Sequence, residues 1–375
     1  MATTFFVMTH KKFQPPANEA YIPLHVGRAL GDDLGYLGDN TGTDQISAEN
    51  PYFGELTGLY WIWKNYEGQE NIATNHYRRF FYDEDGHLMT SAKADELLKT
   101  HNIIVSKKAT IPQTYREYYA EAHNLRDLEA IGRSIEKIYP GYYPFFEEVL
   151  SGHIVYSGNL MIMPRKLYDE YCTWLFTILF DASSEIDVSG YDLYHARVYG
   201  FLSEELLLVW AHAKELSVYE ATVGFTEEKA ETQELKLAVA ELLKQGHVKD
   251  AQELFNNIMA IRPDLSLPAS DFHGEIEKLQ PILYIMNLEK ENHMSGFLDV
   301  SHELPQLFEH YDTTYKILQH ISTRSESDED LTYLATHFFS PAALEVYLAY
   351  DPYQQFHSKP LDEPYMREWW QQMSS

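Results

Sequence analysis

The densest group of side chains suited to chemistry is His-Tyr-Arg-Arg-Phe-Phe at residues 76–81. Two adjacent arginines, Arg78 and Arg79, directly follow this motif's His76 and Tyr77. A guanidinium group forms paired hydrogen bonds to phosphate oxygens, so two of them suit a diphosphate. Lys11 and Lys12 supply a second basic group after an N-terminal apolar run. The pattern indicates a phosphate-binding pocket, and pairing of both arginines with some of the chain's many acids is the alternative.

Asp83 and Asp85 follow this motif immediately, with one residue between them. Two carboxylates at this spacing can share a divalent ion that is bound to a nucleotide diphosphate, because Mg²⁺ and Mn²⁺ prefer oxygen ligands. An Asp-Gly step among acids is also typical of a surface turn. The sequence leaves both interpretations open.

Glu204 and Glu205 follow Gly200 and Ser203, where the sequence predicts the start of a helix with Ser203 as its N-cap. The helix dipole alone favours acids in a first turn. A carboxylate at a helix start that faces a cleft is also well placed to act as a general base.

Short polar side chains mark two further candidate positions. Asp39 and Asn40 lie in a long Gly-rich loop, where they can bind sugar hydroxyls or ribose, or build Asx turns. Asn159 stands in a turn before an apolar strand and could place its amide in a sugar pocket.

These residues are embedded in alternating strands and helices. The apolar pattern predicts strands at 3–8, 71–76 and 102–106, a strand pair at 153–156 and 159–163, and helices at 50–65, 91–101, 115–137 and 166–180. Such alternation predicts an α/β sheet with helices on its faces. Ligands bind such sheets outside the carboxyl ends of the strands, which places residues 9–10 and 76–79 at one edge.

The pattern changes to helices after Phe225, so we expect two domains, at residues 1–225 and 226–375. Residues 232–265 match the spacing of one tetratricopeptide-like hairpin. No second copy follows, and arrays of such repeats need about three copies. A helical hairpin that merely resembles the repeat is therefore the preferred interpretation.

The amino-acid composition excludes several kinds of binding partner and bears on where in the cell the protein is expected. The net charge of −28 argues against nucleic acid and anionic lipid surfaces as general partners. The single cysteine, Cys172, excludes an internal disulfide and a cysteine metal cluster. No apolar run approaches the ~18 residues of a transmembrane segment. We expect a cytoplasmic protein, with peripheral attachment at the inner face of the membrane as an alternative.

Several segments in residues 1–225 resemble, in the same order, the bacterial glycosyltransferases of capsular and exopolysaccharide gene clusters. That family has long been described as a domain of unknown function. The similar segments lie at 9–12, 21–27, 39–47, 50–65, 76–80, 159–163, 171–176 and 197–204.

The resemblance implies a GT-A-like nucleotide-sugar domain, followed here by an all-α domain outside the match. It implies a hexosyltransferase that uses a nucleoside-diphosphate sugar, with UDP-galactose as the expected donor. The acceptor would be a glycan, a lipid-linked glycan or a protein.

The resemblance also implies roles for single residues. Those expected at the donor are His10, Lys11, His76, Arg78, Arg79, Asp39 and Asn40. Asn159 and Trp61 are expected at the acceptor, and Glu204 is the expected base. The family pattern usually has arginine after that glutamate, whereas this chain has Glu205, which leaves the base open between the two. The pattern does not include Asp83 and Asp85, so the resemblance implies no metal there.

A non-catalytic glycan-binding protein is the alternative function. Its stacking platforms would be Trp61 and Trp63, although core packing also explains buried tryptophans. A glycan reader needs no paired arginines at a strand end, so the basic residues discriminate between the two functions. In either case the helical tail is expected to bind a protein or peptide partner.

Overall fold

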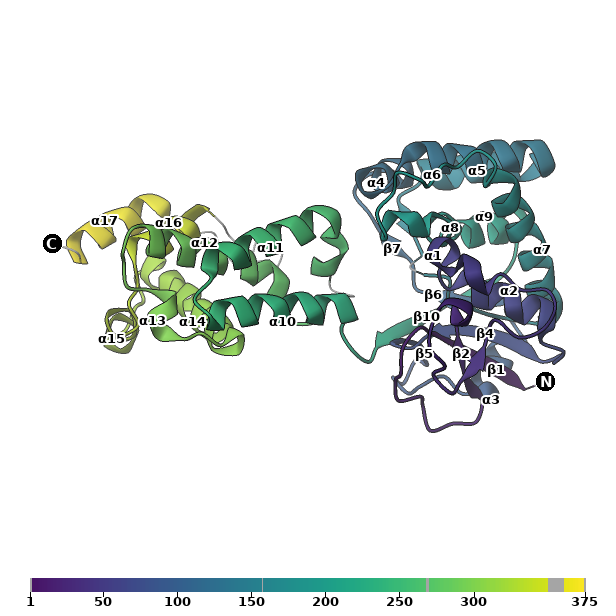
Figure 1. Cartoon of the computed structure of the whole chain (residues 1–375), viewed down its shortest axis with the longest axis horizontal. Helices are drawn as coiled ribbons and strands as arrows, with labels where there is room; N and C mark the ends of the chain where they lie inside the picture. Colours follow the sequence, from purple (N-terminus) through teal and green to yellow (C-terminus); the bar gives the residue numbers. More distant parts are fainter. Residues whose placement is uncertain (1, 157, 268–269, 350–360, 374–375) are drawn as a thin grey trace. The chain divides into compact units, whose positions relative to one another are not determined.

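The computed structural model describes residues 2–156, 158–267, 270–349 and 361–373. The chain divides into two compact units, Met1–Thr226 and Glu227–Ser375 (Figure 1). Each unit has its own hydrophobic core. The two units are described separately.

The N-terminal unit is built on one sheet with the strand order β3-β2-β1-β4-β5-β10-β6-β9, in which β9 also pairs with β4. The strands are β1 Thr3–Thr9, β2 Tyr21–His25, β3 Leu37–Gly38, β4 Asn71–His76, β5 Arg79–Tyr82, β6 Ile103–Ser106, β9 Met161–Met163 and β10 Val218–Phe225. β1 runs parallel to β4 with Met8 opposite His76, so the carboxyl ends of both strands meet at one edge. The predicted α/β class is confirmed.

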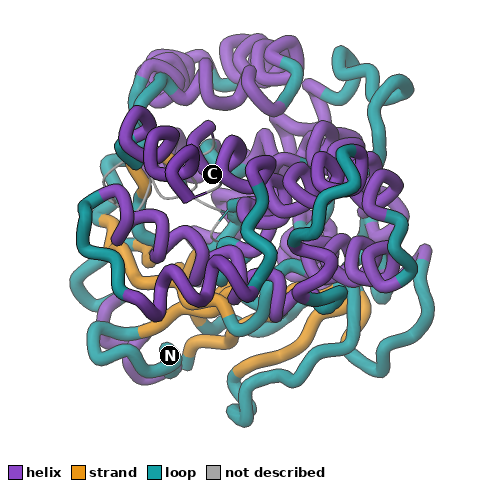
Figure 2. Tube along the Cα trace, turned by 90° about the vertical axis from the view of Figure 1, so that its left-hand side faces the viewer, coloured by secondary structure: helices purple, strands orange, loops and turns teal. Residues whose placement is uncertain are grey.

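Both faces of the sheet are covered by helices, which explains why β1 is apolar on both of its faces from Phe5 to Met8. Along β1, Phe5 and Val7 belong to the core that includes Ala94 of α3 (Ser91–Leu97). The alternate residues Phe6 and Met8 belong to the larger core. That core includes α2 (Leu56–Asn65) and α7 (Arg165–Ala182), which Figure 1 shows on the opposite face from α3. Figure 2 shows most of the strands gathered in the lower part of the view.

Two predicted helices are each divided in the structure. The predicted helix 50–65 is α1 (Asn50–Phe53) and α2, separated at Gly54, whose φ of 55° is unfavourable for other residues. The predicted helix 115–137 is α4 (Tyr115–Ala122) and α5 (Leu125–Ile138). Asn124 begins the second of these, because its side chain caps the N–H of Arg126.

Two local predictions around the later motifs are wrong. The segments 153–156 and 159–163 do not pair: β8 (Ile154–Val155) pairs with β7 (Ala109–Thr110), whereas β9 pairs with β4 and β6. All three residues of β9 are buried, which suits a position between two strands of the large sheet. A hairpin with the half-exposed β8 would not bury them in this way. Ser203 is not an N-cap but the last residue of α8 (Val198–Ser203), and Glu205 precedes α9 (Leu206–Ala213).

The regular elements of the described residues after Thr226 are all helices. They are α10 Ala230–Lys244, α11 Val248–Ile261, α12 Glu275–Glu291, α13 Phe297–Val300, α14 Leu304–Ser322, α15 Asp328–Thr336, α16 Pro341–Ala349 and α17 Glu363–Met373. α10 and α11 pack against each other as a hairpin, as the sequence predicts for 232–265. None of the helices within the described ranges has the length and apolar character needed to cross a bilayer.

Candidate active site

A network of buried polar side chains lies where β4 ends and β9 begins. Asn159 is its centre and is only 1% exposed. Its side-chain N–H₂ donates to Glu55 Oε1 at 2.7 Å, and its side-chain oxygen accepts from Ser203 Oγ at 2.9 Å. Its backbone carbonyl accepts from Thr74 Oγ1 at 2.8 Å. Asn159 therefore joins the sheet, the start of α2 and the end of α8.

The buried Glu55 lies close to the half-buried His76 and to Arg197. Arg197 Nη2 lies 3.7 Å from Glu55 Oε2. Burial raises the pKa of Glu55, but His76, Arg197 and the Asn159 hydrogen bond together lower it below its ordinary value. Burial lowers the pKa of His76 below its ordinary value, against the opposing effect of the Glu55 charge. Its Nε2 atom has no hydrogen-bond partner within the described chain.

Glu204 and Glu205 have different surroundings, although they are neighbours in sequence. Burial raises the pKa of Glu204 to about 7, and the charge of Glu55 adds to this effect. The Glu204 carboxylate accepts a hydrogen bond from Gly158 N–H and feels the opposing charges of Arg79 and Arg197. Glu204 is partly exposed.

Glu205 instead points into the protein and is 3% exposed. Its Oε1 atom accepts from the N–H of Tyr156 at 3.2 Å, and burial raises its pKa to about 8. The sequence leaves the base open between the two glutamates. Of the two, only the Glu204 carboxylate is both partly exposed and next to the arginines.

Arg79 approaches the same site from the start of β5. Gly158 adopts a φ of +73°, and a Cβ atom there would lie 2.9 Å from Arg79 Nη1. The guanidinium therefore packs directly on the turn whose N–H binds Glu204. Arg78 is 4% exposed, and the guanidinium carbons of both arginines lie 5.6 Å from the centre of the Phe225 ring.

The other predicted basic residues lie at the neighbouring strand end. Lys11 Nζ lies 4.7 Å from the centre of the Tyr77 ring, and the His10 ring lies 5.3 Å from it. Tyr77 N–H donates to the carbonyl of Met8, which fixes the end of β4 beside the end of β1. Both basic groups are therefore at one sheet edge.

Asp39 and Trp61 lie where they contribute to the protein's own packing. Asp39 is fully buried and accepts from the N–H groups of Gly27 and Arg28 and from the hydroxyls of Ser47 and Thr57. Both of its oxygens therefore accept hydrogen bonds from the loop and from α2. Trp61 is 5% exposed, and its indole N–H donates to Thr41. Asn40 is exposed on the same loop.

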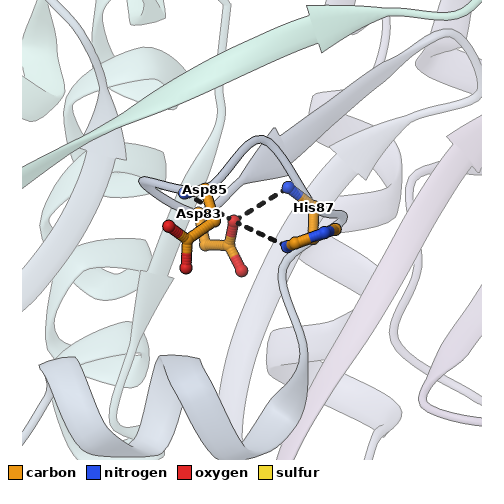
Figure 3. Close-up of side chains that lie close together, drawn as sticks. All are labelled: Asp83, Asp85 and His87. Carbon is orange, nitrogen blue, oxygen red and sulfur yellow. Dashed lines mark hydrogen bonds and ion pairs between the residues drawn. The ribbon is translucent and has the colours of Figure 1, made fainter.

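Asp83, Asp85 and His87 have ligand atoms within 4.8 Å of one another (Figure 3). Asp83 Oδ1 already accepts from the backbone N–H groups of Asp85 and His87, at 3.0 and 2.8 Å. The turn follows the far end of β5 from Arg79, about 13 Å away along the strand at ~3.3 Å per residue. The turn that carries these three residues therefore lies away from the start of β5, where Arg79 stands.

Glu55 and Arg197 belong to the site but were not predicted there. Both occur inside the segments that carry the family resemblance, yet neither stands in a pattern that indicates chemistry by itself. Their roles depend on contacts between distant parts of the chain, since Glu55 and Asn159 are 104 residues apart.

Comparison with solved structures finds the apo structure of the bifunctional glycosyltransferase WbbM. The TM-score is 0.57 at 26% sequence identity. The similarity covers 61% of this chain and 46% of that chain, so it spans less than half of the known structure. Comparison with curated proteins finds no match.

The family described as Domain of unknown function (DUF4422) matches residues 4–215. The match includes β1, β4, β9 and α8, which together carry the network around Glu55 and Glu204. More than half of the sequence lies within it, and the chain therefore belongs to the DUF4422 family.

Proposed function

We propose that the N-terminal unit is a glycosyltransferase that moves a hexose from a nucleoside-diphosphate sugar to a glycan or glycoconjugate in cell-surface polysaccharide or glycoprotein biosynthesis. The observation that carries the proposal is the position of a high-pKa carboxylate, Glu204, beside Arg79 and Arg197 at the end of β4. The similarity to WbbM supports the same reaction class. A uridine diphosphate sugar is the donor we expect.

The cationic side of the site suits the leaving diphosphate. Arg79 and Arg197 are both partly exposed, and Arg79 Nε has no partner within the described chain. Guanidinium groups in such a position stabilise the negative charge that develops as the bond to the sugar breaks. Lys11 extends the positive surface along the same edge, where its ammonium group and the His10 ring both contact Tyr77.

Glu204 supplies the base in this proposal. Its carboxylate takes the proton of the acceptor hydroxyl as that oxygen attacks the anomeric carbon. The bond between the anomeric carbon and the diphosphate oxygen breaks, and its electron pair leaves with the diphosphate. A pKa near 7 leaves a substantial ionised fraction at neutral pH while keeping the carboxylate basic.

A divalent ion would add charge neutralisation to such a reaction. Asp83 and Asp85 offer the right ligand atoms, but their turn lies at the wrong end of β5 for a diphosphate held by Arg79. No step is therefore assigned to an ion held by these residues.

The alternative function, glycan binding without catalysis, is less well supported because Trp61 does not present a ring face to a ligand. A stacking platform must present a ring face, whereas Trp61 is buried in the larger core with its N–H satisfied. The basic edge has no role in reading a neutral glycan.

A thermal-shift screen of the full chain against UDP-, GDP-, dTDP- and CMP-sugars, with and without Mn²⁺, tests the proposal. A ligand at about 100 times its dissociation constant stabilises a protein by ~2.7 kcal/mol. One nucleotide class should raise the melting temperature, and Arg79→Ala should abolish the shift. Arg133→Ala, on an exposed side chain paired with Glu185, is the matched control and should retain it. A folded protein that responds to none of these ligands contradicts the proposal.

A further inference from the structure

A cavity of about 200 Å³ lies between the start of α5 and the loop that precedes α8. Its wall contains Tyr119 from α4, Asp127 from the first turn of α5, and Tyr191 and His195 from that loop. Aromatic rings and polar atoms therefore face the same space.

Much of this wall is held in place by its own hydrogen bonds. Tyr191 Oη donates to Asp127 Oδ2 at 2.6 Å and accepts from the Asn124 amide at 2.8 Å. The His195 ring is bonded on both sides, to Asp192 Oδ2 at 2.6 Å and to the carbonyl of Ala122 at 2.9 Å. The wall is thus preorganised, which lowers the cost of ordering side chains when a ligand binds.

The Tyr119 hydroxyl is the exception. Tyr119 is 2% exposed, and its hydroxyl has no hydrogen-bond partner in the described parts of the chain. A buried hydroxyl without a partner costs about 1–3 kcal/mol. Tyr119 also lines the cavity, so a polar ligand group that reached its hydroxyl would supply the missing hydrogen bond.

The cavity is close to the proposed base. Val198 lines the cavity at the start of α8, and Glu204 directly follows the end of that helix. The two positions are separated by about 9 Å along the helix axis at ~1.5 Å per residue. Burial raises the pKa of Tyr119, and the charges of both Asp127 and Glu204 add to this effect. Tyr119 is therefore close enough to interact electrostatically both with Asp127 in the cavity and with Glu204 in the candidate active site.

The lining chemistry selects the ligand class. Asp127 and Asp192 are acidic, and none of the described residues that line the cavity is lysine or arginine. A phosphate would be repelled here, in contrast to the edge that carries Arg79. Aromatic rings pack on the apolar face of a sugar ring, while carboxylate and hydroxyl groups bind its hydroxyls.

We propose that this cavity is an acceptor subsite that binds a neutral sugar residue of the glycan that receives the transferred hexose. The proposal rests on the transferase function above. Because Glu204 lies about 9 Å along α8 from Val198, the sugar in the cavity is a neighbour of the reacting sugar rather than the reacting sugar itself.

Saturation-transfer NMR on the full chain tests this subsite. The probes are the methyl α- and β-glycosides of glucose, galactose, mannose and N-acetylglucosamine, with glucose 1-phosphate as the anionic comparison. Spectra are recorded with UDP present, and UDP binding is measured separately. The variants are Tyr119→Phe and Asp127→Asn. The control is Tyr171→Phe, which also removes a buried hydroxyl without a partner, from the core side of α7.

At least one neutral glycoside should bind, and glucose 1-phosphate should not. Tyr119→Phe and Asp127→Asn should each weaken glycoside binding tenfold or more and leave UDP binding unchanged, while Tyr171→Phe should change neither. Unchanged glycoside binding in both cavity variants overturns the proposal, and so does a protein that binds UDP but none of the neutral glycosides. A third outcome separates the two proposals: the unmodified chain does not bind UDP, but it binds a glycoside and Tyr119→Phe weakens that binding. This result would overturn the transferase function and support the sugar site.

Discussion

At the scale of single residues, the site contains two adjacent glutamates whose side chains differ in burial and in the groups that they contact. Glu205 is buried and binds the N–H of Tyr156, whereas Glu204 is partly exposed beside Gly158 and Arg79. The sequence predicts that one of this pair is a base, but it does not indicate which. The choice depends on how α8 ends, which is a tertiary feature.

Replacing Glu204 with glutamine should reduce kcat by 10²- to 10⁴-fold, the usual contribution of a positioned base. The affinity for the nucleotide sugar should remain, because the arginines are unchanged. Steady-state kinetics with the donor identified by the thermal-shift screen measure both quantities. Glu136→Gln, an exposed residue of α5, is the control. A variant with full kcat would exclude Glu204 as the base.

The pH dependence of the same carboxylate gives a second prediction. Burial raises its pKa from 4.5 to about 7, so the ionised base is lost as pH falls through about 7, and kcat/KM should fall with it. Stability should show the opposite dependence. The folded state binds the proton more tightly, so ionisation destabilises it as pH rises from 4.5 towards 7.

Glu204→Gln should therefore melt higher than the unmodified chain at pH 8 and equally at pH 4, by calorimetry. A lower melting temperature at pH 8 would show that the carboxylate stabilises the fold in its ionised form.

At the scale of elements, the turn between β8 and β9 connects the base to the cationic edge. Gly158→Ala places a Cβ atom 2.9 Å from Arg79 Nη1, in a backbone conformation with φ of +73°. Gly86→Ala is a matched control, because Gly86 has φ of +78° and no atom within 4 Å of the new Cβ.

Both variants should lose about 1–2 kcal/mol of stability from the left-handed conformation. Only Gly158→Ala should also weaken nucleotide-sugar binding, measured by titration calorimetry. If the two variants bind the nucleotide sugar equally well, Arg79 does not contribute to the donor site.

A partly buried ion-pair cluster stabilises the helical unit. Lys236 Nζ lies 3.0 Å from Glu228, 3.0 Å from Asp271 and 2.5 Å from Glu275, with its side chain 11% exposed. Lys236→Met leaves three carboxylates without their cation, and loss of one partner of a buried pair costs about 3–5 kcal/mol.

Urea unfolding should show this loss in the transition of the helical unit. Lys249→Met, which removes an exposed lysine, should change stability by less than about 1 kcal/mol. Equal effects of the two substitutions would show that the Lys236 cluster is not a stabilising contact.

The sequence predicts the strands that contain apolar runs. β1 and β6 have such runs and are buried on both faces. β4 was predicted as a short strand from Ile72 and Ala73 alone. β10 was missed because its residues are mostly half-buried and carry no such run. The breaks at Gly54 and Asn124 were missed because helical periodicity continues across them. Which strands pair, and therefore which motifs meet, depends on contacts that periodicity does not encode.

At the scale of the whole molecule, the chain combines an overall charge of −28 with a locally cationic sheet edge. The negative surface repels nucleic acid. We therefore expect anions to bind only at the cationic sheet edge that carries Arg79. The two compact units have separate hydrophobic cores, which indicates that each can fold by itself. We propose that the helical unit binds a partner protein.

Removing residues 227–375 should therefore leave nucleotide-sugar binding intact and change the location of the protein in cells. Titration calorimetry and imaging of a tagged chain measure the two effects. A shorter chain that ends at residue 217 is the contrasting variant. It lacks β10, which pairs with β5 and β6, and should not fold. Unchanged location after removal of 227–375 would contradict a partner-binding role.

A crystal structure of the chain with the nucleotide sugar that stabilises it tests the central claim most directly. The account predicts that the diphosphate lies within hydrogen-bonding distance of Arg79 and that the anomeric carbon faces Glu204. A diphosphate bound elsewhere, for example at the turn of Asp83 and Asp85, would contradict it.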